Sequence, residues 1–246
     1  MTGAPAPVLA LRDALHAALV AESSPEQKRS ADAYFKGALP FLGVKGPAVD
    51  AVFKGSKAAR AALTASERLA LGALLLGESE LAEVRHLGIL TLSAEVKRLP
   101  PGWLEAIEPT LERQCTNWGT ADAMAGRVLR YRLPDAADRA RMVTWATSSS
   151  PWLRRMACVA YVNEAHKGLY ADEIRVVVPA ALALDHRFSQ LGAGWLLRNR
   201  WLAAPAEVEA FLWRERGNMR REALRYAIEK MPPGLQAAFL SGPAPS

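Results

Sequence analysis

Residues 80–98 read ELAEVRHLGILTLSAEVKR, and their periodicity decides the fold class. Leu81, Val84, Leu87 and Ala94 fall on one stripe, because apolar residues three or four positions apart share a face of an α-helix. Similar stripes run through residues 103–114, 118–133, 138–147, 152–166, 172–184, 189–202, 205–214 and 219–231. No segment shows the clean apolar–polar alternation of a strand, so we predict an all-α chain.

Short breaks containing proline and serine separate the expected helices. The run Ser148–Pro151 is typical of a helix start, whereas Pro109 and Pro179 fall inside expected helices and should split or kink them. Two helices with their turns span roughly 35–40 residues, the length of a HEAT-type repeat. We therefore predict an α-α superhelix, a curved solenoid of HEAT-like repeats, as a single domain over residues 1–240. Residues 241–246 (SGPAPS) are expected to form a disordered tail.

The composition excludes several classes of protein. Half of the 246 residues are hydrophobic, and the 17 Gly and 16 Pro follow no short period, which excludes collagen-like, low-complexity and disordered chains. Cys115 and Cys158 are too few for a disulfide scaffold and lack metal-type spacing. No apolar run reaches the ~18 residues of a membrane span. Arg12 and Asp13 interrupt the N-terminal apolar run, so we interpret residues 4–24 as an amphipathic helix in a cytoplasmic protein without a membrane partner.

The charge and the absent motifs narrow the chemistry. The net charge is +6, and Arg supplies 23 of the 31 basic residues, which suits phosphate recognition. Residues 151–200 hold 7 basic and 4 acidic residues, so half of the excess lies there. Phosphate-loop, dinucleotide-binding and zinc motifs are missing from the sequence, and the four His are isolated. We therefore expect neither a cofactor nor a metal.

Tryptophan is abundant, and several of the seven Trp lie beside charged residues. Trp118 and Asp122 are spaced i,i+4 and Trp195 and Arg198 i,i+3, so each pair shares a helix face. Trp152–Arg155 combines an indole with two arginines in the first turn of a helix. The helix dipole disfavours cations at this position, so an external anion would stabilise the arginines there. Buried tryptophans with charges at their rim would produce the same spacing, so the pattern alone leaves both interpretations open.

Seven segments together carry a family resemblance. They are YFK (34–36), PFLGVK (40–45), EVRHLGILTL (83–92), NWGTAD (117–122), WLRR (152–155), GWLLR (194–198) and RREA (220–223). In this order and separation they resemble the AlkD-like DNA alkylation repair family, which are HEAT-like-repeat DNA glycosylases. The resemblance extends from about residue 30 to about residue 230.

The resemblance implies roles for individual residues. Asp122 matches the catalytic carboxylate of the family, and Trp118 and Trp195 match the two tryptophans that flank the deoxyribose. The matched DNA-binding residues are Arg155, Arg154, Arg198, Tyr34 and Lys45. Asn117, Gly119 and Lys45 depart from the usual residues of the family, and these departures concern lesion contacts and substrate range.

The implied reaction is hydrolysis of the N-glycosidic bond of a cationic N3- or N7-alkylated purine such as 3-methyladenine or 7-methylguanine. Such a base is already a good leaving group, so the enzyme has to stabilise an oxocarbenium-like sugar, as a carboxylate and indole faces can do. The family works without a base-binding pocket, which implies tolerance of bulky adducts. The implied partner is double-stranded DNA containing alkylated bases, bound by a monomer associated with the nucleoid.

Two alternatives stay open. The chain could be a non-catalytic helical-repeat protein that binds distorted or branched DNA or a protein partner, with Asp122 solvated and Trp195 in the core. A helix-hairpin-helix glycosylase is the second alternative, based on residues 42–47 (LGVKGP). Its two glycines are three positions apart instead of two, and no suitably placed catalytic Asp follows.

Overall fold

The computed structural model describes residues 4–241, and within them the chain forms sixteen α-helices and three short 3₁₀ helices without any strand. The predicted all-α architecture is confirmed. Contacts divide the chain into two compact units, residues 1–131 and 132–246. The single domain expected over residues 1–240 stays a prediction. No helix between residues 4 and 241 is long and apolar enough to cross a membrane.

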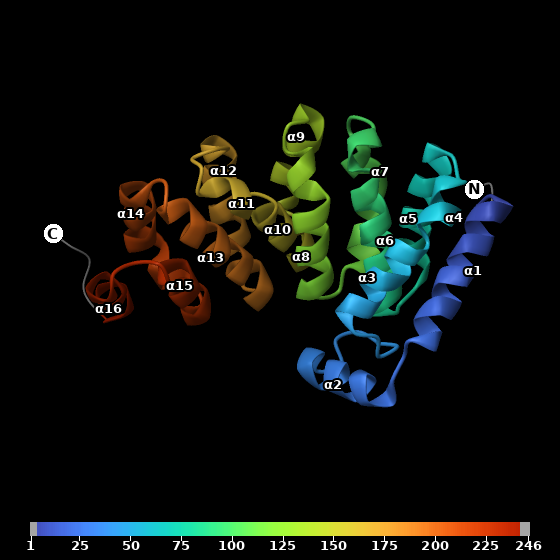
Figure 1. Cartoon of the computed structure of the whole chain (residues 1–246). Helices are drawn as coiled ribbons and strands as arrows, with labels where there is room; N and C mark the ends of the chain where they lie inside the picture. The colour runs from blue at the N-terminus through green and yellow to red at the C-terminus, as the bar shows by residue number, and fades with distance from the viewer. Residues whose placement is uncertain (1–3, 242–246) are drawn as a thin grey trace. The chain divides into compact units, whose positions relative to one another are not determined.

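The first unit contains eight α-helices (Figure 1). They are α1 (Ala6–Ala21), α2 (Pro25–Phe35), α3 (Gly46–Gly55), α4 (Lys57–Ala61), α5 (Ala65–Glu78), α6 (Ala82–Ala94), α7 (Trp103–Gln114) and α8 (Trp118–Arg127). Short 3₁₀ turns follow α6 at Val96–Arg98 and α8 at Leu129–Arg132. The segment expected to be one helix over residues 118–133 is therefore a helix followed by a 3₁₀ turn, because an apolar repeat of three residues fits both conformations.

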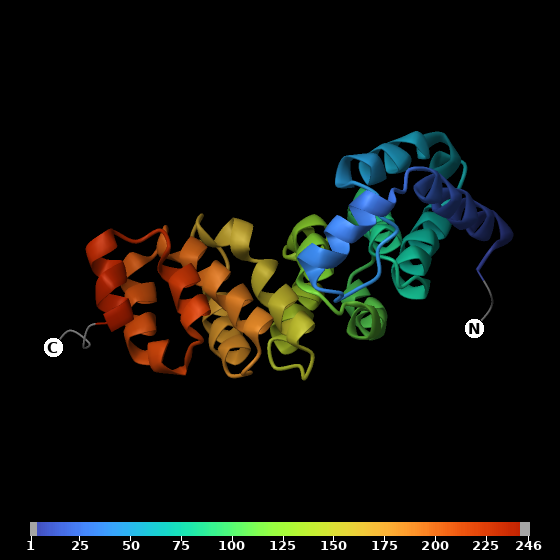
Figure 2. The same ribbon diagram turned by 90° about the horizontal axis from the view of Figure 1, so that it is seen from below.

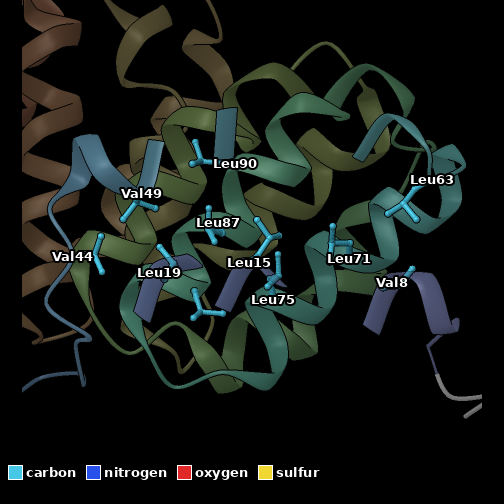
Figure 3. Packing of buried hydrophobic residues seen from close by; sticks show 11 residues of the cluster. Val8, Leu15, Leu19, Val44, Val49, Leu63, Leu71, Leu75, Leu87 and Leu90 are labelled. Carbon is cyan, nitrogen blue, oxygen red and sulfur yellow. The ribbon is translucent and has the colours of Figure 1, made fainter. Parts of the chain in front are cut away.

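Aliphatic side chains from α1, α3, α5 and α6, and from the loops that precede α3 and α5, form the core of the first unit (Figure 3). The buried members are Val8, Leu15, Leu19, Val44, Val49, Leu63, Leu71, Leu75, Val84, Leu87 and Leu90. Val84 and Leu87 of the stripe that predicts α6 are buried, whereas Ala94 of the same stripe is exposed. Ile89 and Leu92 lie off the stripe and are buried too, because α6 is covered on most of its sides. Burying a side chain of this kind contributes about 1.5–3 kcal/mol.

The second unit consists of two layers of helices. Its elements are α9 (Ala136–Trp145), α10 (Pro151–Val159), α11 (Val162–Ala165), α12 (Ala171–Leu182), α13 (Arg187–Trp201), α14 (Pro205–Glu215), the 3₁₀ turn Arg216–Asn218, α15 (Arg221–Ile228) and α16 (Pro233–Ser241). Helix α13 packs between α10 and α15, while α12 and α14 pack against it from the other layer. Figures 1 and 2 show these helices side by side along the unit. Stacked helix pairs of this kind are the packing of HEAT-like repeats.

Local sequence signals determine where most of the helices begin. Ser150 caps α10 by accepting a hydrogen bond from the Leu153 N–H, as the Ser148–Pro151 run predicts. Pro109 and Pro179 do not split their helices, because α7 and α12 continue through them. Ser241 ends α16, and the remaining residues of the expected tail, 242–246, lie outside the described residues.

Candidate active site

Trp118 and Asp122 lie in the first turns of α8. The helix begins at this point because Asn117 is extended and its side-chain oxygen accepts the Thr120 N–H at 2.9 Å, a cap that contributes about 1 kcal/mol. The Asn117 amide also donates to the Thr120 hydroxyl at 3.0 Å. Both candidate residues are half-buried and one helical turn apart, so they share a face of α8.

Two aromatic residues contact Trp118, and a third packs behind them. The Phe35 ring stacks on the indole with centroids 5.2 Å apart and an interplanar angle of 19°, and the Tyr34 ring meets it edge-on at 5.9 Å. Phe41 packs against Phe35, and the centroids of these two rings lie 5.0 Å apart. Tyr34 itself is 68% exposed. The indole is therefore held by its neighbours at a surface where Tyr34 is accessible.

Lys45 stands on a loop that a buried carboxylate organises. The side chain of Glu83 accepts the backbone N–H groups of Leu42 at 3.0 Å, Gly43 at 2.9 Å and Val44 at 3.0 Å. Glu83 is only 5% exposed, so these three donors satisfy it in place of water. The loop leads directly into α3, where Lys45 is the exposed N-cap residue. This role of Glu83 could not be predicted from the sequence, where Glu83 belongs only to a segment of the family resemblance.

The two arginines at the start of α10 have partners within the second unit. The Arg154 guanidinium donates to the carbonyl oxygens of Ser148, Thr147 and Ala180, and its burial lowers its pKa. Arg155 is 6% exposed and donates to the Phe188 carbonyl at 3.0 Å. The position of Arg154 in the first turn of a helix is unfavourable for a cation and indicated a negative partner. Backbone carbonyl oxygens are that partner in the structure.

Trp195 and Arg198 both lie against the ring of Tyr226, a residue that is not among the predicted site residues. Tyr226 of α15 lies beside Trp195 of α13, with ring centroids 6.3 Å apart and an interplanar angle of 27°. The Arg198 guanidinium carbon lies 4.8 Å from the centre of the Tyr226 ring, and its terminal nitrogen donates to Glu229 at 2.7 Å. Trp195 is half-buried and is therefore not a closed core residue. Tyr226 follows the arginine-rich 220–223 segment by three residues, which is the only hint of it in the sequence.

The predicted site residues divide between the two units. Trp118, Asp122, Tyr34 and Lys45 belong to the first unit, where Tyr34 and Trp118 are in contact. Trp195 and the arginines at 154, 155 and 198 belong to the second unit. That both sets act on one nucleotide stays a prediction. No group of three or more His, Cys, Asp or Glu suited to a metal ion occurs within the described part of the chain.

The family model for DNA alkylation repair enzymes matches residues 15–231. The chain belongs to the DNA alkylation repair enzyme family. This confirms the family resemblance of the sequence and gives the chain a role in DNA alkylation repair.

A solved structure has the same fold as this DNA alkylation repair family member. It is that of a predicted DNA alkylation repair enzyme from Enterococcus faecalis, with a TM-score of 0.75 and 17% sequence identity over 86% of this chain and 98% of the other. The predicted fold class, an all-α solenoid of HEAT-like repeats, is confirmed. A search of curated proteins gave no significant match.

Proposed function

We propose that this DNA alkylation repair family member is a monofunctional glycosylase, which hydrolyses the N-glycosidic bond of cationic N3- or N7-alkylated purines in duplex DNA. The observation that carries the proposal is the placement of Trp118 and Asp122 one turn apart on one face of α8, with the indole fixed by aromatic neighbours. An acid and an indole in this arrangement can act together on one developing positive charge.

The reaction requires stabilisation of a cation more than proton transfer. As the bond between C1′ and the base nitrogen breaks, its electron pair neutralises the positive charge of the alkylated base, and the deoxyribose becomes oxocarbenium-like. The Asp122 carboxylate stabilises this charge and orients a water molecule, whose oxygen bonds to C1′ while its proton passes to solvent. The indole of Trp118 presents a π face to the same positive charge.

The basic side chains account for binding in this proposal. Arg155, Lys45 and the hydroxyl of Tyr34 contact the sugar–phosphate backbone, and affinity should therefore fall steeply with salt. Arg154, Arg155 and Arg198 all have protein partners as well, and these contacts hold the three guanidinium groups in place for phosphate binding. Because recognition is through the sugar and phosphates, without a base-binding pocket, bulky adducts are included among the substrates.

Release of 7-methylguanine from methylated duplex DNA tests the proposal. Asp122→Asn should reduce single-turnover base release by about 10²–10³-fold, the usual effect of removing one group that stabilises transition-state charge. Asp13→Asn, the same change at a side chain 68% exposed on α1, is the matched control and should retain full activity.

The result for the unaltered protein distinguishes a glycosylase from a non-catalytic DNA-binding protein. Base release no greater than in buffer would refute the glycosylase. If the protein then still bound branched or distorted duplexes, the non-catalytic DNA-binding alternative would replace it.

A further inference from the structure

Helix α2 contacts the rest of the first unit at both of its ends. It contains no buried residue, and Figure 1 shows it at the edge of the unit next to α3. At its start, the Ser24 N–H donates to the Gly43 carbonyl at 3.0 Å. Gly43 has a φ of 91°, and a Cβ there would lie 2.6 Å from the Lys28 nitrogen, so this approach requires glycine. At its end, the helix is held by aromatic contacts.

Phe35, the last residue of α2, is the centre of those contacts. Its ring lies 5.1 Å from that of Tyr34, 5.0 Å from that of Phe41 and 5.2 Å from the Trp118 indole, measured between centroids. Only the contact with Trp118 is nearly parallel, at 19°. Phe35 therefore covers one face of the indole, and a sugar can use only the opposite face.

The stack depends on a missing side chain at Gly119. A Cβ at this position would lie 3.2 Å from Cε1 and 3.3 Å from Cζ of Phe35, closer than ordinary van der Waals contact. A Cβ would also lie 3.2 Å from the Asn117 side-chain oxygen, so a larger residue would press on the ring from a side where the helix cap leaves it little room. Alanine is a better helix former than glycine by up to about 1 kcal/mol, so helix stability alone would favour Ala at Gly119. Close approach of the Phe35 ring gives a physical reason for glycine.

We infer that Phe35, seated on Gly119, is a positioning residue that fixes the orientation of the Trp118 indole for the glycosylase reaction. The inference rests on the proposed function. Phe35 does not touch the reacting atoms but determines which face of Trp118 meets the sugar and how precisely. A group misplaced by about 1 Å can cost up to 10²-fold in rate, because catalysis depends on orientation.

Two substitutions with opposite effects on bulk test the inference in the full-length protein. Phe35→Leu keeps an apolar side chain but removes the flat ring, and Gly119→Ala keeps the ring but displaces it. Both should lower the single-turnover rate of 7-methylguanine release about tenfold while the KM for DNA stays within about twofold. Phe35→Tyr, which restores a flat ring, should recover most of the rate. Gly126→Ala is the control on the same helix, because a Cβ there meets no atom within 4 Å.

A spectroscopic measurement separates positioning from a purely structural effect. In protein labelled with fluorotryptophan, the signal lost in Trp118→Phe identifies Trp118 among the seven tryptophans. Phe35→Leu and Gly119→Ala should shift and broaden that fluorine NMR signal and leave the other six in place. Unchanged rates and an unchanged Trp118 signal in both variants would overturn the inference. If the unaltered protein releases no base, the proposed function is wrong, whereas the NMR signal still decides whether Phe35 and Gly119 fix the indole.

Discussion

Replacement of Glu83 by Gln should destabilise the first unit more than its small change in shape suggests. The carboxylate accepts three backbone N–H groups from the loop that precedes α3, two of them at Oε1 and one at Oε2. These donors come from Leu42, Gly43 and Val44, about forty residues away in the sequence. Glu83 is therefore the main polar tie between α6 and this loop.

The magnitude follows from what a glutamine can still do at this position. Its oxygen can keep the Gly43 and Val44 bonds, but a neutral acceptor contributes about 0.5–1.5 kcal/mol each instead of about 1.5–3 kcal/mol. Its NH₂ group would face the Leu42 N–H, so that donor would be left unsatisfied. Together these losses amount to about 3 kcal/mol, or a fall of roughly 6–12 °C in the Tm of the first unit.

Thermal unfolding followed by circular dichroism measures the effect. Glu80→Gln is the matched control, because Glu80 is exposed, lies three residues earlier and changes the net charge equally. We expect Glu80→Gln to unfold within about 2 °C of the unaltered protein, as surface substitutions usually do. If Glu83→Gln unfolded at the same temperature as this control, the assigned hydrogen bonds would contribute nothing and the reasoning would be wrong.

Three further predictions concern packing, pH and thiol reactivity. Gly194→Ala should lower the free energy of unfolding in denaturant by about 1–3 kcal/mol, because the new Cβ would lie 2.6 Å from a carbonyl oxygen of α15. Gly126→Ala should be neutral or stabilising, since a Cβ there meets no atom within 4 Å. Equal stability of the two variants would contradict this prediction. Burial lowers the pKa of His86 below 6.5, so the unfolded chain binds a proton more readily and stability should fall from pH 7 to pH 5. His86→Gln should make this fall shallower by up to about 1.4 kcal/mol per pH unit, and an unchanged slope would argue against the assignment. Burial raises the pKa of Cys158 to about 12 and also encloses Cys115, so neither thiol should react with a disulfide reagent at pH 8 until the protein is denatured.

Helix content and helix starts could be predicted from the sequence because they depend on residues close together in the chain. The stripe containing Val84 and Leu87 predicted the position of α6 and two of its buried residues. Ser150 gave the start of α10 through a hydrogen bond to a residue three positions away. The i,i+4 spacing of Trp118 and Asp122 gave their shared face of α8 for the same reason.

Contacts between distant residues could not be predicted, since many partners satisfy the same side chain equally well. Arginine in the first turn of α10 indicated an anionic partner, and the fold supplied the carbonyls around Arg154 instead. Phe35 and Trp118 are 83 residues apart, and Tyr226 is 31 residues from Trp195, so neither ring pair leaves a periodic signal.

The sequence by itself therefore determined an all-α repeat chain, its family and the pairing of an indole with an acid on one helix. The tertiary structure decided which side chains support that pair, through the stack of Phe35 on Trp118 and the hydrogen bonds of Glu83. The physical reason is the distance along the chain over which each interaction acts. Helix periodicity and capping act within one or two turns, whereas ring stacking and buried hydrogen bonds depend on which distant segments the packed core brings together.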